Sequence, residues 1–196
     1  CFGGLYVLQP NQAALLMFFG RYTGTDRGEG LRWANPFSNT RKISVRAHNF
    51  NSDKLKVNDL RGNPIEIASA VVWRVSDTAR ASFDVEDYER YVLTQAEAAV
   101  RHLASRYAYD NLEVDAQGNA SSEITLRGGT DEVGAALLDE LAARFAQAGI
   151  VVVDAKLTHL AYAPEIAGTM LRRQQAEAVV AARAKIVQGA VGMVEM

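Results

Sequence analysis

The sequence predicts an α+β protein with a strand-rich first half and an αβ second half that ends in a long helix. Before residue 76, apolar and polar residues alternate along several short segments, as they do in half-buried strands. In segments 84–107 and 130–148, apolar residues recur every three or four positions, as they do on amphipathic helices. Segment 149–163 has strand character, and no proline occurs after Pro164, so a long helix can follow.

The composition is that of an ordinary globular protein with one or two domains. The chain has 196 residues, of which 48% are hydrophobic and 22% are charged, which is enough apolar residue to bury a core. The net charge is −2, so the chain has no excess of the basic residues with which nucleic-acid-binding proteins contact phosphates, and we expect no nucleic-acid partner. Because Cys1 is the single cysteine, an internal disulfide framework and a cysteine-rich metal site are excluded.

The beginning of the chain suggests a membrane anchor upstream of it. The chain does not start with Met, and its first residues are apolar and rich in glycine. The longest apolar run, residues 13–19, is shorter than the roughly 20 residues that a spanning helix needs, and it is better explained as a strand. We therefore expect membrane association through an apolar segment before Cys1, with the side of the membrane left open.

The first two strands are expected to form a hairpin. Segments 5–8 and 12–20 flank the turn dipeptide Pro10-Asn11. Segment 20–42 follows as a glycine-rich connection, and its glycines lack the spacing of a phosphate-binding loop.

This connection also carries a candidate membrane-proximal group, Arg32, Trp33 and Phe37. The two aromatic residues lie among five basic and only two acidic residues, and an aromatic residue flanked by arginine could touch lipid headgroups. The alternative is a loop in which Trp33 and Phe37 cap the core. The sequence alone favours this alternative, because isolated aromatic residues in turns are more often packing residues.

The remaining strands of the first half follow in order. Segments 43–50 and 54–58 are predicted strands, and 59–64 is a predicted turn. Segment 65–75 has the clearest alternation, with Glu66 and Arg74 on one face. Its buried face is predicted to consist of Ile65, Ile67, Ser69, Val71, Trp73 and Val75.

Two helices come next, separated by a polar loop. Asp84 is the expected cap of the first helix, and Thr130 that of the second, which Gly149 ends. Segment 110–129 between them is polar, contains two turn signals and is expected to be the most mobile internal loop. The predicted core stripes are Tyr88, Val92, Ala96, Ala99, Leu103 and Tyr107 on the first helix, and Val133, Leu137, Leu141, Phe145 and Ala148 on the second.

The last 48 residues begin as a strand and continue as a helix. Pro164 and Glu165 mark the helix start, since proline loses no hydrogen bond there and a carboxylate suits the positive end of the helix dipole. The strand face predicted to be mostly apolar consists of Val151, Val153, Ala155, Leu157, His159 and Ala161.

The long helix carries two narrow stripes of small and apolar residues, which we call seam 1 and seam 2. Two such stripes suggest helical neighbours on both sides, so the helix is expected to mediate homo-oligomerisation; the alternative is a terminal helix that lies on its own domain. Seam 1 comprises Leu171, Ala178, Ala182, Ile186 and Met193, and seam 2 comprises Ala176, Val180, Val187, Val191 and Val194. The predicted oligomerisation residues are Leu171, Ala178, Ala182 and Ile186 of seam 1, with Val180 and Val187 of seam 2.

Recognisable catalytic motifs are missing from the sequence. It has no nucleophile elbow, zinc-protease signature, phosphate-binding loop or dinucleotide fingerprint. His48, His102 and His159 lie on different predicted elements, and the acidic cluster at 84–89 has the chemistry of a helix start. We therefore expect no enzymatic activity, catalytic residue, metal site or cofactor. A hydrolase with an unfamiliar site is the least favoured alternative.

Three stretches resemble the SPFH, or Band 7, superfamily, which includes stomatin, prohibitin, flotillin and the bacterial HflK and HflC proteins. GLRWANPF at 30–37 resembles the turn after the family's first hairpin, and LKVNDLRGNPIEIASAVVWRVSDTARA at 55–81 resembles its paired strands. GIVVVDAKLTHLAYAPEIAGTMLRRQQAEAVVAARAKIVQGA at 149–190 resembles the most specific part, a strand, a Pro-Glu helix start and an alanine-rich helix.

The resemblance implies an SPFH domain over residues 5–163 and the start of a coiled-coil-like assembly helix over 164–196. It also implies a membrane-anchored, homo-oligomeric scaffold that contacts membrane lipid, organises membrane microdomains and regulates membrane proteases or channels. The alternative is a monomeric regulatory module that docks on such a protease or channel. Because a helix that docks in a groove needs large anchors, the mostly Ala and Val seams favour helix-to-helix packing.

Overall fold

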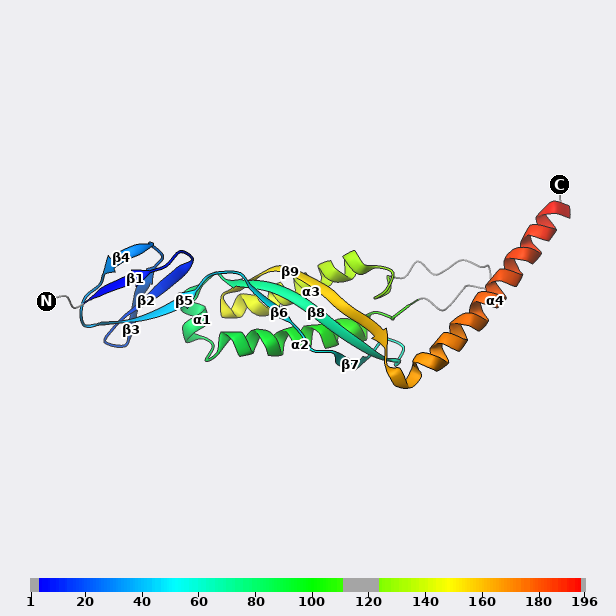
Figure 1. Ribbon diagram of the computed structural model, residues 1–196, viewed down its shortest axis with the longest axis horizontal. Coiled ribbons are helices and arrows are strands. Elements are labelled where there is room, and N and C mark those ends of the chain that lie inside the picture. The colour runs from blue at the N-terminus through cyan, green and yellow to red at the C-terminus, as the bar shows by residue number, and fades with distance from the viewer. Residues whose placement is uncertain (1–3, 111–123, 195–196) are drawn as a thin grey trace. The chain divides into compact units, whose positions relative to one another are not determined.

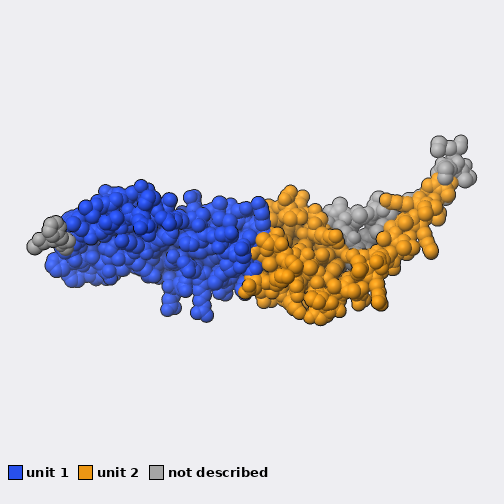
Figure 2. All heavy atoms as spheres, in the orientation of Figure 1, with its two compact units in different colours: residues 1–52, 70–99, 138–156 blue, residues 53–69, 100–137, 157–196 orange. Residues whose placement is uncertain are grey.

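The computed structural model describes residues 4–110 and 124–194 (Figure 1). Within this range, residues 188 and 191–194 are described by their backbone alone. The chain divides into two compact units (Figure 2). Unit 1 contains residues 1–52, 70–99 and 138–156, and unit 2 contains residues 53–69, 100–137 and 157–196. The elements form an α+β fold that ends in a long helix, as the sequence predicts.

Five antiparallel strands form the strand-rich part of unit 1. They are β1 (Leu5–Leu8), β2 (Gln12–Phe18), β3 (Arg21–Asp26), β4 (Gly30–Trp33) and β5 (Ser38–Ser44). β1 pairs with β4 in a two-stranded ribbon, and β2 lies between β3 and β5. The expected hairpin between the first two strands is therefore wrong.

The prediction of a connection over 20–42 is also wrong, because three of these strands lie in or overlap it. Two of its glycines have positive φ, one at a turn and one at the start of a strand. Phe19 and Gly20 both have positive φ, 46° and 81°, and form the two-residue turn between β2 and β3. Gly30 has φ of 94° where β4 begins. The threonines and the tyrosine between these turns favour strand.

A second sheet is built around β8 (Pro64–Val75), which pairs with β6 (His48–Asn51), β7 (Leu55–Asn58) and β9 (Ile150–Tyr162). The predicted strand at 43–50 is thus broken into the end of β5 and the start of β6. The predicted buried face of β8 is confirmed, since all six of its residues are buried. In unit 1 this face meets helix α2, because the Trp73 and Tyr88 ring centroids are 6.0 Å apart.

The predicted face of β9 is wrong in its first half. Ile150 and Val152 are buried, whereas Val151 and Val153 are 42% and 52% exposed. Ala155 is buried as predicted, but it lies three positions after Val152. A strand alternates with period two, so the alternation of buried residues is interrupted between these positions.

Helix α2 (Tyr88–Arg106) and helix α3 (Thr130–Phe145) match the predicted amphipathic segments. Asp84 is not the cap of α2: Asp87 accepts hydrogen bonds from the backbone N–H groups of Glu89 and Arg90. A short helix, α1 (Thr78–Phe83), is capped by Asp77 and was not predicted. A 3₁₀ turn follows α3, and Gly149, with φ of 66°, ends it as predicted. In the predicted stripes, Tyr88 and Tyr107 are only partly buried and the other nine residues are buried.

The polar loop predicted at 110–129 lies mostly outside the described residues. Its described end is packed in unit 2, where Leu126 is buried and its N–H donates to the Ala108 carbonyl. Slow amide exchange is therefore expected at Leu126 itself.

Helix α4 (Pro164–Val194) starts at the predicted proline and has 31 residues, about 46 Å at 1.5 Å per residue. Ala163, buried just before it, accepts hydrogen bonds from the N–H groups of Ile166 and Ala167. Among the described helices, none combines the length and the apolar character that crossing a membrane requires.

Candidate functional site

The outer face of the β1–β4 ribbon in unit 1 carries four large apolar side chains. Leu5 lies opposite Trp33, and Val7 lies opposite Leu31. Since directly opposed residues of an antiparallel pair share a face, these four side chains form one surface, which we call the ribbon face. Their exposed fractions are 44%, 68%, 54% and 68% respectively. An exposed apolar surface of this kind is a candidate for a membrane or protein interaction site.

The inner face of the ribbon is held by a polar cluster around Asp26. The Tyr6 hydroxyl donates to Asp26 Oδ2 at 2.6 Å, and Arg32 Nε lies 3.2 Å from the same oxygen. The Gly28 N–H donates to Asp26 Oδ1 at 2.9 Å. Tyr6 and Arg32 are opposed in the ribbon, and Leu8 beside them is buried. This cluster fixes which side of the ribbon faces outward.

The cluster shifts two pKa values in opposite directions. Burial raises the pKa of the Tyr6 phenol to about 12, and the hydrogen bond to Asp26 acts in the same direction. The hydrogen bond from Tyr6 lowers the pKa of the Asp26 carboxyl, with help from the Gly28 N–H. The neutral phenol and the ionised carboxylate are therefore the forms that the fold favours.

Tyr6→Phe tests whether this cluster holds the ribbon. The folded-state pKa of Tyr6 lies above its unfolded value, so its contribution to stability is complete below pH 10 and is lost as the pH rises through about 12. Wild type should be more stable than the variant at neutral pH, and the difference should shrink between pH 10 and pH 12. Urea unfolding followed by circular dichroism measures it, and a difference that does not change with pH would contradict this role.

A cluster of three phenylalanines projects from the β2–β3 turn and the segment before β5. The ring centroids of Phe18 and Phe19 are 4.7 Å apart, and those of Phe19 and Phe37 are 6.5 Å apart and stacked. Phe19 is 78% exposed and has a positive φ, a conformation that costs energy for a bulky residue. Strained residues of this kind cluster at functional sites, which favours a binding role for these rings.

Helix α4 presents the second candidate surface. The six predicted oligomerisation residues, Leu171, Ala178, Val180, Ala182, Ile186 and Val187, are all exposed. The alternative in which this helix lies on its own domain is therefore wrong for these residues. An apolar stripe that no described part of the chain covers is suited to a partner helix.

The first turns of α4 are fastened within unit 2. Lys56 Nζ and Glu165 Oε1 are 2.6 Å apart at the helix start. About two and a half turns later, Gln174 Nε2 donates to Asp110 Oδ2 at 3.0 Å, and the other oxygen of Asp110 accepts from the Tyr162 hydroxyl. The helix is thus tied to the sheet end and to the end of α2, whereas the six predicted oligomerisation residues stay exposed.

Comparison with known families decides the identity of the fold. The sequence profile of the SPFH domain / Band 7 family matches residues 6–190, which is most of the chain. The chain belongs to the SPFH family. SPFH proteins are generally membrane-associated and generally serve as scaffolds without catalytic activity. No curated protein matches the chain significantly.

Within residues 4–110 and 124–194, no group of three or more His, Cys, Asp or Glu side chains could hold a metal ion. His48 stacks on Trp73 at 4.7 Å, and His159 lies 3.9 Å from Glu66, so two of the three histidines have structural neighbours in different units.

The structure separates the three residues predicted to lie near a membrane. Trp33 and Phe37 are exposed, so the prediction that they cap the core is wrong. Arg32 lies on the opposite side of the ribbon from Trp33 and pairs with Asp26. Sequence reasoning missed Leu5, Val7 and Leu31. Apolar and polar residues alternate along both strands, but this alternation identifies one shared apolar face only when β1 is known to pair with β4.

Proposed function

We propose that this chain belongs to a membrane-anchored SPFH scaffold that assembles with copies of itself through helix α4. The observation that carries this proposal is the exposure of all six predicted seam residues on a helix of 31 residues. Without a partner, this much exposed Leu, Ile and Val on one helix is unfavourable, because apolar surface is stabilised by burial. In this proposal residues 5–163 form the SPFH domain and residues 164–196 start the assembly helix.

The ribbon face supplies the membrane contact in this proposal. Leu31 and Trp33 on β4 can enter the boundary between headgroups and acyl chains, where tryptophan is favoured. Phe19 and Phe37 offer further aromatic area in unit 1. An apolar segment upstream of Cys1 would hold the ribbon face at the bilayer, and assembly in the membrane plane would organise microdomains and position membrane proteases or channels.

The test is clustering of labelled chains on a membrane. Two populations of the chain, labelled with a donor and an acceptor dye, are attached to vesicles through an N-terminal histidine tag and a nickel-chelating lipid. Self-assembly predicts energy transfer well above that of a non-associating tagged protein at the same surface density. Transfer equal to that reference would support the alternative, a monomeric module that docks on a membrane protease or channel.

A further inference from the structure

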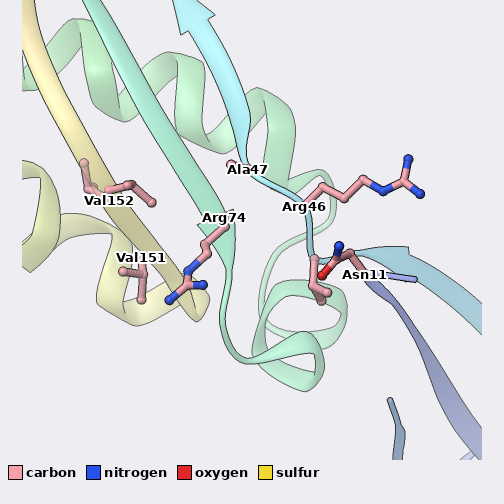
Figure 3. Close-up of a pocket in the computed structure, with 8 residues that line it drawn as sticks. Asn11, Arg46, Ala47, Arg74, Val151 and Val152 are labelled. Carbon is pink, nitrogen blue, oxygen red and sulfur yellow. The ribbon is translucent and has the colours of Figure 1, made fainter. Parts of the chain in front are cut away.

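An open groove of about 560 Å³ lies in unit 1, and neither the ribbon face nor helix α4 accounts for it (Figure 3). Its apolar wall contains Val45 and the exposed side chains of Val151 and Val153 on β9. Arg46 and Arg74 also line it, and none of the described residues around it is acidic. The groove therefore combines exposed apolar surface with two positive charges.

The groove lies on the face of the sheet that α2 does not cover. The odd-numbered side of β8 is buried, and its Trp73 contacts Tyr88 at the start of α2. Arg74 is the next residue and is exposed, so its side chain projects from the opposite face. Figure 3 shows the strands in front of the helices and the Arg74 side chain near Val151. The floor of the groove is therefore the open face of this sheet.

On one edge of β8, the valines lie beside Arg74. The Ser76 N–H donates to the Gly149 carbonyl at 3.0 Å, and the residue after β9 donates in the same way to the first residue of β8, so the two strands run antiparallel. Two residues further along each strand, Arg74 therefore lies beside Val151. Their side chains share a face, because directly opposed residues of an antiparallel pair do so.

On the other edge of β8 lies Arg46. His48 opposes Trp73 in the β6–β8 pair, so Ala47, one residue earlier, lies beside Arg74. Arg46 comes directly before Ala47, and in Figure 3 its side chain extends away from the sheet, whereas that of Arg74 turns towards β9. The order across the groove is thus valine, Arg74 and Arg46, over two strand spacings or about 10 Å.

This order predicts the chemistry of an occupant. The two guanidinium groups point in different directions, which does not suit a single phosphate or carboxylate with its charge at one point. In an extended peptide, alternate side chains point to the same side and are roughly 6.5–7 Å apart. An apolar residue followed by carboxylates two and four positions later would present all three side chains to the groove in the matching order. Each carboxylate could then form charge-assisted hydrogen bonds with one arginine.

The chain itself does not supply such a segment. Carboxylates two positions apart occur at 84 and 86, at 87 and 89, and at 113 and 115. The first pair lies in the turn before α2, and the second lies at the start of α2, where Asp87 caps the helix, so neither is extended. The third pair lies outside the described residues, and Asn111 and Gln117 occupy the positions that require an apolar residue. The occupant is therefore expected to come from a different protein.

We propose that the groove binds an extended acidic segment of another protein, in which an apolar residue and two carboxylates occupy alternate positions. The apolar residue packs on Val151 and Val153, and the carboxylates pair with Arg74 and Arg46. The argument for this partner is charge complementarity, which gives an interface its specificity. The groove is separate from the seams of α4 and from the ribbon face, so the contact depends neither on self-assembly nor on lipid binding.

Fluorescence anisotropy with the full chain in solution tests the contact. The probe is a short labelled peptide with Val-Thr-Glu-Thr-Glu at its centre, and the control peptide has the rearranged order Val-Glu-Glu-Thr-Thr. In the control the two carboxylates point to opposite sides, so its binding should be about tenfold weaker. Equal binding of the two peptides, or no binding of the probe at about 1 mM, would overturn the proposal.

Charge reversal tests the two arginines. Arg46→Glu/Arg74→Glu should lower the affinity for the probe about tenfold or more, because like charges then face each other. The same variant should bind a Val-Thr-Lys-Thr-Lys peptide more tightly than the wild type does. Arg61→Glu/Arg101→Glu is the matched control, since both arginines are exposed and lie in unit 2, and it should bind the probe as the wild type does.

Two results would contradict the assignment of the groove. One is equal loss of probe binding in both double variants, with both folded by circular dichroism. The other is unchanged probe binding in Arg46→Glu/Arg74→Glu. If that variant instead loses binding to phosphatidylserine vesicles, the groove is a lipid headgroup site and the peptide proposal fails. Energy transfer between wild-type chains on vesicles is independent of these outcomes, so the proposed function is tested separately.

Discussion

Ala182→Glu is expected to dissociate the assembled protein while leaving the protomer folded. Ala182 is exposed in the protomer, so a carboxylate there meets water and does not disturb the fold. In an assembled seam the same carboxylate would be buried without a partner, which costs about 3–5 kcal/mol. A loss of this size weakens association by a factor of 100 or more. Light scattering in detergent measures the mass, and circular dichroism measures the fold.

Arg172→Glu is the control for this prediction. Arg172 lies outside both seams and is exposed in the protomer. The variant introduces the same side chain on the same helix and should have a smaller effect on the assembled mass. If Ala182→Glu keeps the assembled mass while folded, seam 1 is not an assembly surface, and the docking-module alternative gains support.

Leu31→Glu/Trp33→Glu is expected to abolish the binding of the chain to lipid vesicles. Burial of one large apolar side chain stabilises by about 1.5–3 kcal/mol, so loss of two weakens partition by roughly 100-fold or more, before the cost of two carboxylates near acyl chains is added. Both residues are exposed, so the fold should persist. Vesicle flotation of the untagged chain measures the effect.

Leu60→Glu provides the control for the ribbon face. Leu60 is also a large exposed apolar residue, but it lies in the turn between β7 and β8 in unit 2. This variant should float as wild type does. Equal flotation of wild type and Leu31→Glu/Trp33→Glu would show that the ribbon face does not contact lipid, and a protein partner for this face would then be the better explanation.

Local sequence patterns were sufficient for the elements that carry their own signals. The β8 alternation, the stripes of α2 and α3, Gly149 and Pro164 each act within a few residues, so the sequence predicts them directly. The strands between residues 20 and 42 were missed because glycine indicates a loop by composition, whereas Gly20 and Gly30 serve turns and strand starts here. The pairing of β1 with β4 depends on contacts distant in sequence, which no local pattern specifies.

Of the two candidate surfaces, the sequence predicted the one that depends on local spacing and missed the one that depends on long-range contacts. The seams of α4 follow from helical spacing alone, and the structure places the six predicted oligomerisation residues at the surface, although their role in assembly stays a prediction. The outward direction of the ribbon face did not follow from the sequence, because it depends on the Asp26 cluster that holds Tyr6 and Arg32 inward. Leu5, Val7 and Leu31 would otherwise be taken as core residues of two ordinary strands.

Self-assembly at a membrane is tested most directly by counting protomers in the membrane-bound particle. The protein is extracted from membranes in detergent together with any upstream segment, and the protein mass of the particle is measured by light scattering with correction for bound detergent. A single narrow species with a mass that is a whole-number multiple of the protomer mass is expected. It should fall to the protomer mass in Ala182→Glu. A wild-type particle that contains one protomer at every concentration would contradict assembly.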